Sequence, residues 1–223
     1  MGHCYLVGAG EFYGLFDTRS GDFVIAADGG YDTLCRLGIT PDLLIGDMDS
    51  IADTPENLPL ERYPVRKDDT DMFLAYRAGV ARGYTEFFLY GGTGGREDHT
   101  FSNLSLLLFA AKHGHRMTMI GRQNDFLCIY GENTAPSGRD GVFSGGRVTL
   151  SGAPGEHVSV FAFGGEAHGV SIRGLSYTAE DITLLPEVPL GASNLFLDTP
   201  GEVSVRDGAL LIVTEHKTLE KHS

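Results

Sequence analysis

The sequence has little of several features that would assign a chain to a special class. It has only three cysteines, Cys4, Cys35 and Cys128, which lie far apart and form no Cys-x-x-Cys pair. We therefore expect buried, reduced thiols and a cytoplasmic protein. Basic residues are also in the minority, because 17 Lys and Arg stand against 30 Asp and Glu, for a formal charge of −13. Nucleic-acid binding relies on cations that neutralise phosphates, so this balance argues against a nucleic-acid partner.

Long apolar runs are missing as well. No run approaches the roughly 18 residues of a membrane span, and the first residues lack the basic segment of a signal peptide. Leu6 occupies the position where the myristoylation pattern needs Ser or Thr. We expect no membrane partner, and we interpret this end of the chain as the first strand. At 223 residues, 42% of them hydrophobic, the chain is long enough for one large domain or two small ones.

The first half of the chain alternates short apolar runs with helical patterns. The runs predict strands over residues 4–7, 24–27, 43–45 and 87–90, and the patterns predict helices over residues 30–37, 70–82 and 98–113. This order is typical of a parallel sheet covered by helices on both faces. In such sheets ligands bind beyond the carboxyl ends of the strands. Three predicted strands end in acidic residues, glycines or both.

The second half has a different composition. From about Ile129 onward it is rich in Gly, Ser, Thr and Val, and its short apolar runs are separated by turn residues. The runs predict strands over residues 147–150, 157–163, 169–172, 194–197, 203–206 and 210–214. Regular short strands of this kind favour an antiparallel β-sandwich. We therefore predict an α/β fold, with a parallel-sheet domain over residues 1–130 and a β-sandwich over residues 139–223.

A glycine-rich stretch follows the predicted strand over residues 87–90. Residues 91–95 include four glycines, which can adopt positive φ and let a ligand approach the backbone, and a helix start with free amides follows. The stretch is neither a Walker A loop nor a dinucleotide fingerprint, so glycine alone leaves a phosphate site and a structural turn equally open. Arg96 adds a planar fork for phosphate oxygens and Asp98 adds a carboxylate, while His99 and Asn103 share one helical face. Together these residues favour phosphate binding.

Carboxylates follow other predicted strands. Asp47 and Asp49 are two residues apart and could hold one hard cation such as Mg²⁺. In the run from Lys67 to Asp71, Thr70 can cap the following helix, and capping is the simpler interpretation of these acids. If Asp28, Asp47, Asp49, Asp71 and Asp98 gathered at one edge of the sheet, their repulsion would need compensation by divalent cations.

The order of these motifs resembles the thiamine pyrophosphokinases of the bacterial type. The motifs are ADGG, GDMDS, KDDTD and GGTGGREDH with a later Asn103, followed by Gly174-Leu175-Ser176-Tyr177 and Ser193-Asn194. The resemblance implies an N-terminal ATP-binding α/β domain, a C-terminal β-sandwich, and a homodimer with thiamine bound between its subunits. It also implies transfer of the pyrophosphoryl group of ATP to the thiamine hydroxyl, with release of AMP.

The resemblance further implies a role for each motif residue. The expected Mg²⁺ ligands are Asp47, Asp49 and Asp71. The expected nucleotide contacts are Lys67, Thr70, Gly91, Gly92, Thr93, Gly94, Gly95 and Arg96. The expected catalytic residues are Asp71, Asp98 and Arg96, with the hydroxyl proton passing to Asp98 or Asp71. The expected thiamine contacts are Asp28, Asp47 and, from the other subunit, Tyr177, Ser193 and Asn194. Leu74 and Leu195 depart from the family pattern, since many relatives have Lys and Glu there.

Two other functions fit parts of the sequence. A metal-dependent phosphatase or nucleotide-sugar transferase could use the pair of Asp47 and Asp49, although the pair follows the third predicted strand, where such phosphatases have theirs after the first. A non-catalytic sensor of thiamine or nucleotide is the alternative outside the enzymes. Sensors of this kind usually lose the motif acids, and here all of them are present.

Overall fold

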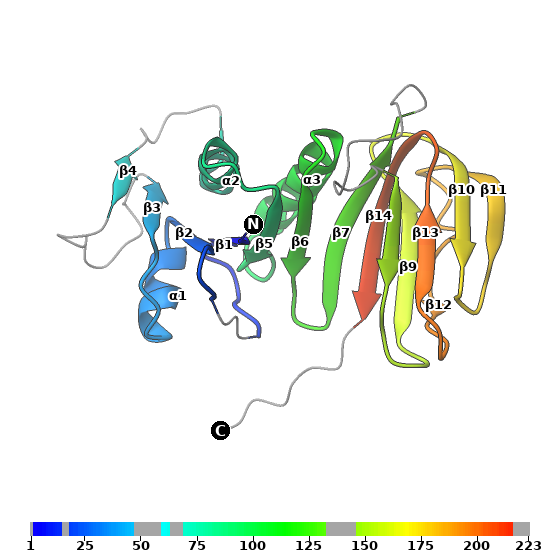
Figure 1. Ribbon diagram of the computed structural model, residues 1–223, viewed down its shortest axis with the longest axis horizontal. Coiled ribbons are helices and arrows are strands. Elements are labelled where there is room, and N and C mark those ends of the chain that lie inside the picture. Colours follow the sequence, from blue (N-terminus) through cyan, green and yellow to red (C-terminus); the bar gives the residue numbers. More distant parts are fainter. Residues whose placement is uncertain (1, 15–17, 47–58, 63–68, 133–145, 216–223) are drawn as a thin grey trace. The chain divides into compact units, whose positions relative to one another are not determined.

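The computed structural model describes residues 2–14, 18–46, 59–62, 69–132 and 146–215 (Figure 1). The chain divides into two compact units. The first unit comprises residues 1–106 and 117–122, and the second comprises residues 107–116 and 123–223.

The first unit contains a parallel sheet. Its strands are β1 (Cys4–Val7), β2 (Phe23–Ala27), β3 (Leu43–Gly46), β4 (Leu60–Arg62), β5 (Glu86–Tyr90) and β6 (Arg116–Ile120). The strand order is β6-β5-β1-β2-β3-β4, and every pair from β5 to β4 is parallel. All four residues of β1 and of β3 are buried, as expected for strands that are covered on both faces.

Three helices accompany these strands in the described part of the chain. They are α1 (Gly30–Arg36), α2 (Asp71–Ala81) and α3 (Glu97–Lys112). Their positions agree with the predicted helices to within one or two residues at each end. In the described parts of the chain, no helix is both long enough and apolar enough to cross a membrane.

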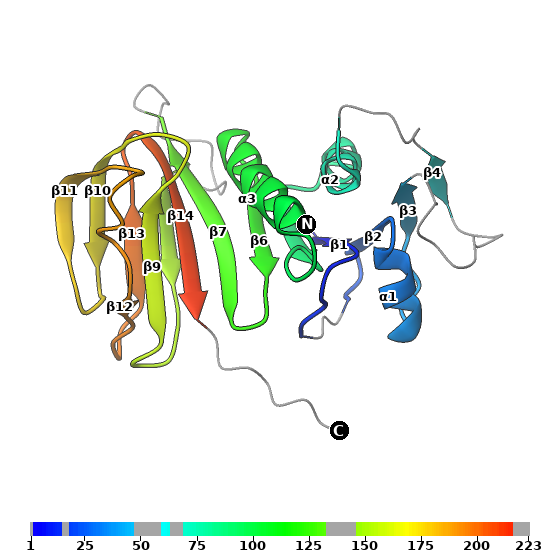
Figure 2. The ribbon, with the colours of Figure 1, turned by 180° about the vertical axis from the view of Figure 1, so that it is seen from behind.

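The helices α1 and α2 cover opposite faces of the sheet. Leu34 of α1 packs in one cluster with Tyr5 of β1. A Cβ atom placed on Gly79 of α2 would lie 2.9 Å from the sulfur of Cys4, the neighbouring residue of the same strand. Successive residues of a strand point to opposite faces, so the two helices lie on different sides, as both views of the ribbon show (Figure 1, Figure 2). The predicted double covering is confirmed.

The second unit is built from two antiparallel layers. One layer has the order β12 (Asn194–Leu195), β9 (His157–Ala162), β14 (Gly208–Glu215) and β7 (Asn124–Gly131). The other has the order β11 (Ala179–Leu184), β10 (Ala167–Arg173), β13 (Gly201–Ser204) and β8 (Arg147–Leu150). All described pairs within the two layers are antiparallel.

One buried core serves both layers of the second unit. Ile129 and Ile212 from the first layer join the same cluster as Val170 and Val203 from the second. A shared apolar core of this kind is what holds a β-sandwich together. A mixed α/β fold with a second antiparallel sheet is therefore confirmed, while the domain limits 1–130 and 139–223 stay a prediction.

The cysteines only partly follow the prediction. All three are free thiols; Cys4 and Cys128 are buried, and burial raises the pKa of each to about 12. The expected burial is wrong for Cys35, which is exposed. Cys35 follows the buried Leu34 on the short helix α1, where successive residues point in directions about 100° apart. Only one stripe of the helix can face the sheet, and Leu34 occupies it.

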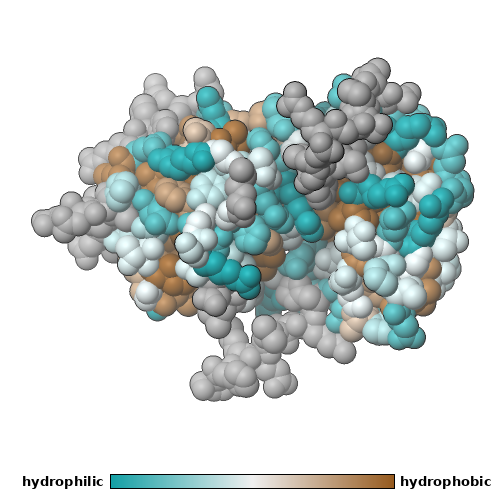
Figure 3. All heavy atoms as spheres, viewed as in Figure 1, coloured by the Kyte–Doolittle hydropathy of each residue, from teal (hydrophilic) through white to brown (hydrophobic). Residues whose placement is uncertain are grey.

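The surface of the face shown in Figure 3 carries its apolar residues in separate groups among polar ones.

Two phenylalanines differ strongly in burial. Phe196 is 1% exposed in the core of the second unit, whereas Phe101 on α3 is 69% exposed. We expect Phe196→Ala to lower the free energy of unfolding by about 3 kcal/mol, because it leaves a cavity. Phe101→Ala should change it by less than about 0.5 kcal/mol.

Urea denaturation followed by circular dichroism measures both changes. The Phe101→Ala variant serves as the matched control, because the same atoms are removed from the surface. Similar losses of stability in the two variants would contradict the core described here.

Candidate active site

The loops that follow β1 and β5 are hydrogen-bonded to each other. The two strands pair in parallel from Cys4 with Phe87 to Val7 with Tyr90. Beyond them, the Gly8 N–H donates to the Tyr90 carbonyl oxygen at 2.9 Å. The next two bonds run from the Gly10 N–H to the Gly91 oxygen at 3.0 Å and from the Glu11 N–H to the Thr93 oxygen at 2.9 Å. Residues 8–11 therefore hold the glycine-rich loop in place.

Two glycines of this loop combine positive φ with little room for a side chain, Gly91 against backbone and Gly94 against the side chain of Glu11. Gly91 has φ +63°, and a Cβ atom there would lie 2.3 Å from the Gly8 oxygen. Gly94 has φ +73°, and its Cβ atom would lie 2.6 Å from Cγ of Glu11. Gly95 also has positive φ, +117°, but nothing lies within 4 Å of the position of its Cβ atom. The predicted positive φ values are confirmed at these three residues, and the loop is open on the side of Gly95.

Asn103 fastens the loop to α3. Its side chain is buried, and its Nδ2 donates to the Gly92 oxygen at 2.9 Å. Gly92 is closed in from another side, because its Cβ atom would lie 2.3 Å from Cδ2 of Leu89. Asn103 thus has a structural role in shaping the loop. His99, four residues earlier, is exposed.

Arg96 and Asp98 form an exposed bidentate pair at the start of α3. Nε and Nη2 of Arg96 donate to the two carboxylate oxygens of Asp98, at 3.1 and 2.6 Å. The hydrogen bond from Arg96 holds the pKa of Asp98 below its ordinary value, and the bond from Asp98 raises the pKa of Arg96. The guanidinium fork that suits a phosphate is therefore held by a carboxylate directly beside the glycine-rich loop.

Asp28 lies where the ends of β2 and β3 meet. It adopts φ +49°, and its N–H donates to the Ile45 oxygen at 2.8 Å. A Cβ atom on Gly46, the last residue of β3, would lie 3.2 Å from Cα of Asp28. Asp47 and Asp49 come directly after Gly46 in sequence and, like Lys67, lie outside the described residues.

The start of α2 lies against the end of β1. Thr70 is the N-cap of the helix, and its Oγ1 accepts a hydrogen bond from the Phe73 N–H at 3.2 Å. The predicted cap is confirmed. Asp71 is the first helical residue, and Cε of the next residue, Met72, would lie 2.8 Å from a Cβ atom on Gly8. The first turn of α2 is therefore next to the loop that follows β1.

These contacts gather several predicted site residues at the carboxyl edge of one sheet. A Cβ atom on Gly29 would lie 3.1 Å from the Cβ of Ala9. The residues that follow β1 and β2 are therefore in contact as well. The described members of the predicted set at this edge are Asp28, Thr70, Asp71, Gly91, Gly92, Thr93, Gly94, Gly95, Arg96 and Asp98. Within the described ranges, no three His, Cys, Asp or Glu side chains lie close enough together to hold a metal ion.

The predicted thiamine contacts of the second unit lie together. Oδ1 of Asn194 accepts from the Tyr177 N–H at 2.8 Å, and its Nδ2 donates to the Tyr177 oxygen at 2.7 Å. Ser193 adopts φ +59°, and its N–H donates to Oγ of Ser159 at 3.0 Å. The ring of Tyr177 is 70% exposed. The two motifs from the second half of the chain are thus one structural feature.

Residues 8–11 are the part of the site that the sequence motifs did not reveal. Glu11 is exposed, and its side chain lies over Gly94 of the glycine-rich loop. The available signal was the sequence Gly8-Ala9-Gly10-Glu11 directly after the first predicted strand. Two glycines at the end of a strand indicate that a ligand or another backbone segment approaches closely there. The contact of these residues with the glycine-rich loop depends on the pairing of β1 with β5, which the sequence alone does not give.

A parallel sheet whose carboxyl edge carries a glycine-rich loop, two helix starts and carboxylates defines an α/β protein of the phosphate-binding class. The family models for "Thiamin pyrophosphokinase, catalytic domain" and "Thiamin pyrophosphokinase, vitamin B1 binding domain" match residues 18–119 and 147–210. The chain belongs to the thiamin pyrophosphokinase family.

Known relatives agree with this membership. The chain is 25% identical over 197 residues to the thiamine pyrophosphokinase of Bacillus subtilis (strain 168), covering 85% of each. Its fold is similar to the crystal structure of thiamine pyrophosphokinase from Bacillus subtilis, with TM-score 0.82, 22% identity and coverage of 96% of this chain and 99% of that chain. The corresponding values for the enzyme from Geobacillus thermodenitrificans are 0.77, 23%, 97% and 99%.

The pairing of Arg96 with Asp98 predicts a specific pH response. The pKa of Asp98 is lowered in the folded protein, so the contribution of the pair to stability is full above the unfolded value of about 4 and is lost as the pH falls through the folded value. Arg96→Gln removes the hydrogen bond and the charge, and we expect the pKa of Asp98 to rise. Titration of the Asp98 carboxyl carbon by NMR measures this shift. An Asp98 pKa that is the same in both proteins would contradict the pairing.

Proposed function

We propose that this protein is a thiamine pyrophosphokinase that transfers the pyrophosphoryl group of ATP to the hydroxyl of thiamine, giving thiamine diphosphate and AMP. The observation that carries the proposal is the meeting of the glycine-rich loop, the starts of α2 and α3 and Asp28 at one edge of the sheet, in a chain of this family. The bond that forms joins the hydroxyl oxygen to the β-phosphorus. The bond that breaks joins the β-phosphorus to the oxygen that leaves with AMP.

The first unit would bind the triphosphate through its loop and helix starts. Gly91 to Gly95 and Thr70 would face the phosphates, together with Lys67 of the same motif as Thr70. Gly95 has open space beside it, so a phosphate can approach the backbone there. Arg96 would turn from Asp98 to the phosphate oxygens. Both partners of that pair are more than 60% exposed, so the exchange costs little.

Magnesium fits the chemistry of the acidic residues. Asp47, Asp49 and Asp71 offer only carboxylate oxygens, the ligands that Mg²⁺ prefers, and they would hold the ion. Asp71 opens α2 beside the end of β1, and Gly46 leads directly into the Asp47 motif. When bound, the ion supplies positive charge that offsets the charges of the triphosphate and of the carboxylates.

A carboxylate would accept the hydroxyl proton, and Asp98 and Asp71 are the candidates. While Arg96 holds Asp98, the pKa of that carboxyl stays below its ordinary value and the carboxylate is a weak base. If Arg96 turns to the triphosphate, its hydrogen bond to Asp98 is lost and the pKa of Asp98 rises. Nucleotide binding would thus make Asp98 a better proton acceptor at the moment when the hydroxyl is in place.

Thiamine would lie between the subunits of a homodimer. Asp28 and Asp47 would contact thiamine from the first unit of one subunit. Tyr177 and Ser193 would contact it from the second unit of the other subunit, where Asn194, the third expected contact, is hydrogen-bonded to the main chain of Tyr177. A flat cation gains from stacking on an aromatic face, and the ring of Tyr177 is available because it is 70% exposed.

Mass analysis of the products formed from ATP, Mg²⁺ and thiamine tests the proposal. We expect thiamine diphosphate and AMP in equal amounts. Inorganic phosphate in place of AMP would support a phosphatase, and a glycosylated product from a nucleotide sugar would support a transferase of another kind. Tight binding of thiamine by calorimetry, with no product in the presence of Mg²⁺, would support a sensor. Each of these three results would overturn the proposal.

Replacement of a single carboxylate tests the assignment of Asp71. Asp71→Asn keeps the shape of the side chain but removes its charge, and we expect kcat to fall by about a thousandfold with the fold intact. Asp69→Asn is the matched control, because Asp69 lies two residues away and pairs with Arg77 at 3.0 Å. Breaking that surface pair should change kcat by less than about twofold. A folded Asp71→Asn variant with near-normal kcat would show that the assignment is wrong.

A further inference from the structure

The exposed ring of Tyr177 is not positioned by packing of its own. Tyr177 belongs to the connection between β10, which ends at Arg173, and β11, which begins at Ala179. With 70% of its surface exposed, the side chain has few neighbours that could fix its direction. The place and direction of the ring therefore depend on how firmly the main chain of residue 177 is held.

The side chain of Asn194 holds that main chain from both sides. Its Oδ1 accepts a hydrogen bond from the Tyr177 N–H at 2.8 Å, and its Nδ2 donates to the Tyr177 oxygen at 2.7 Å. The side-chain amide thus pairs with the peptide groups of Tyr177 as a neighbouring strand would. Asn194 is only 5% exposed, so water competes little for these bonds.

The amide of Asn194 has little capacity left for a ligand. Oδ1 also accepts from the Leu195 N–H at 2.9 Å, so that both acceptor positions of this oxygen are used. One N–H of the amide remains beyond the bond to Tyr177, on a side chain that is 95% buried. A direct polar contact between this amide and a substrate would require at least one of the described bonds to break.

The surrounding chain keeps Asn194 itself in place. Asn194 pairs with Val158 of β9, and the adjacent Ser176 N–H donates to the Leu195 oxygen at 3.0 Å. Leu175 and Phe196 form an isolated bridge, and each is 1% exposed in the core of the second unit. Residues 175 and 176 are therefore held to the core of the second unit. The two hydrogen bonds of the Asn194 amide hold Tyr177 in the same way.

We propose that Asn194 is a positioning residue, which holds the main chain of Tyr177 so that its ring presents a fixed face to a flat, cationic heterocycle. Asn194 acts through Tyr177 and does not itself contact the ligand. The inference rests on the proposed function, in which the ring of Tyr177 stacks on thiamine. Ordering the ring before binding reduces the entropy that binding would otherwise cost.

A double-mutant cycle in the full-length protein tests this coupling. Asn194→Asp is nearly isosteric and keeps the acceptor for the Tyr177 N–H, but it places an acceptor against the Tyr177 oxygen. We expect the Kd for thiamine, measured by calorimetry, to rise about tenfold, which corresponds to the loss of one ordered side chain. Tyr177→Ala should raise it by at least as much. In the Tyr177→Ala background, Asn194→Asp should have no further effect, because the group through which it acts is gone.

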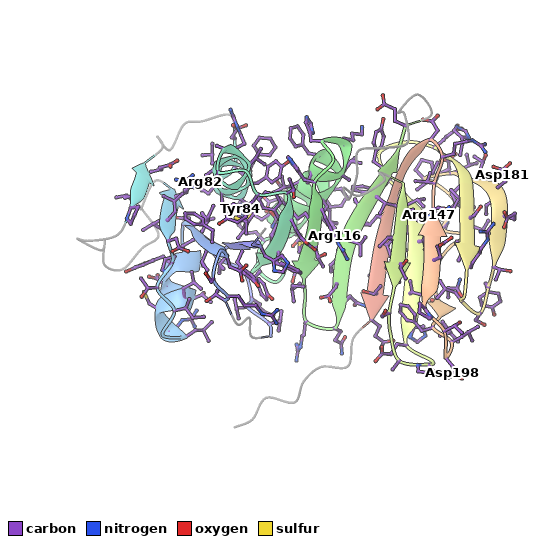
Figure 4. All side chains as sticks on the ribbon, viewed as in Figure 1. Arg82, Tyr84, Arg116, Arg147, Asp181 and Asp198 are labelled. Carbon is purple, nitrogen blue, oxygen red and sulfur yellow. The ribbon has the colours of Figure 1, made fainter. Side chains whose placement is uncertain are left out.

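Additive effects of the two substitutions would overturn the inference, because they would mean that Asn194 contacts thiamine independently. The Kd for Mg²⁺-bound ATP should be the same in the wild-type protein, the two single variants and the double variant. A general disruption of the fold would change this Kd as well. Asp181→Asn is the matched control for an exchange between carboxylate and amide on the same unit. Asp181 is exposed on β11 (Figure 4) and pairs with Arg206 at 2.6 Å. Its replacement should leave the Kd for thiamine unchanged.

Hydrogen exchange of the Tyr177 amide tests the inference without any dependence on binding. We expect slow exchange in the wild-type protein and fast exchange in Asn194→Asp. Fast exchange in the wild-type protein would overturn the inference even if the variant failed to fold. Failure of the proposed function has a different signature: a wild-type protein that binds no thiamine overturns that function, whereas thiamine binding with additive substitutions overturns only the role of Asn194.

Discussion

The hydrogen bonds between the loops after β1 and β5 are the constraint on which the candidate site depends. Parallel neighbours end at the same edge of a sheet, so their loops leave together, and three backbone bonds keep residues 8–11 against residues 90–93. A side chain on Gly91 would push the loops apart. The start of α2 lies against the same Gly8, and Asp28 lies where β2 and β3 end. The site is therefore a product of sheet topology more than of any single motif.

The two units hold their candidate site groups in different ways. In the first unit, main-chain amides and helix starts are fixed by backbone contacts, as suits the binding of an anion. In the second unit, an exposed ring is held by the buried amide of Asn194, which takes the place of a neighbouring strand for Tyr177. The chain matches two family models, a catalytic domain and a vitamin B1 binding domain, and each covers one of these features.

Much of the first unit could be predicted because buried parallel strands are continuous apolar runs and Thr70 is a recognisable cap. The unpredicted strands gave weaker signals. β4 has three residues, two of them charged, and β11 has only one buried residue among six. β7 lies where the composition changes, and its pairing with β14 along all eight of its residues defines it. The bonds of Asn194 could not be predicted, because they join residues 17 positions apart through side-chain geometry.

Under the proposed function, the loops after β1 and β5 and the starts of α2 and α3 form one site for a magnesium-bound triphosphate. Amide NMR spectra recorded during titration with Mg²⁺ and a non-hydrolysable ATP analogue test it most directly. We expect the amides of Gly8, Gly10, Asp71, Gly95 and Arg96 to shift together, with one common Kd. Shifts confined to other parts of the chain, or different Kd values for the two loops, would contradict it.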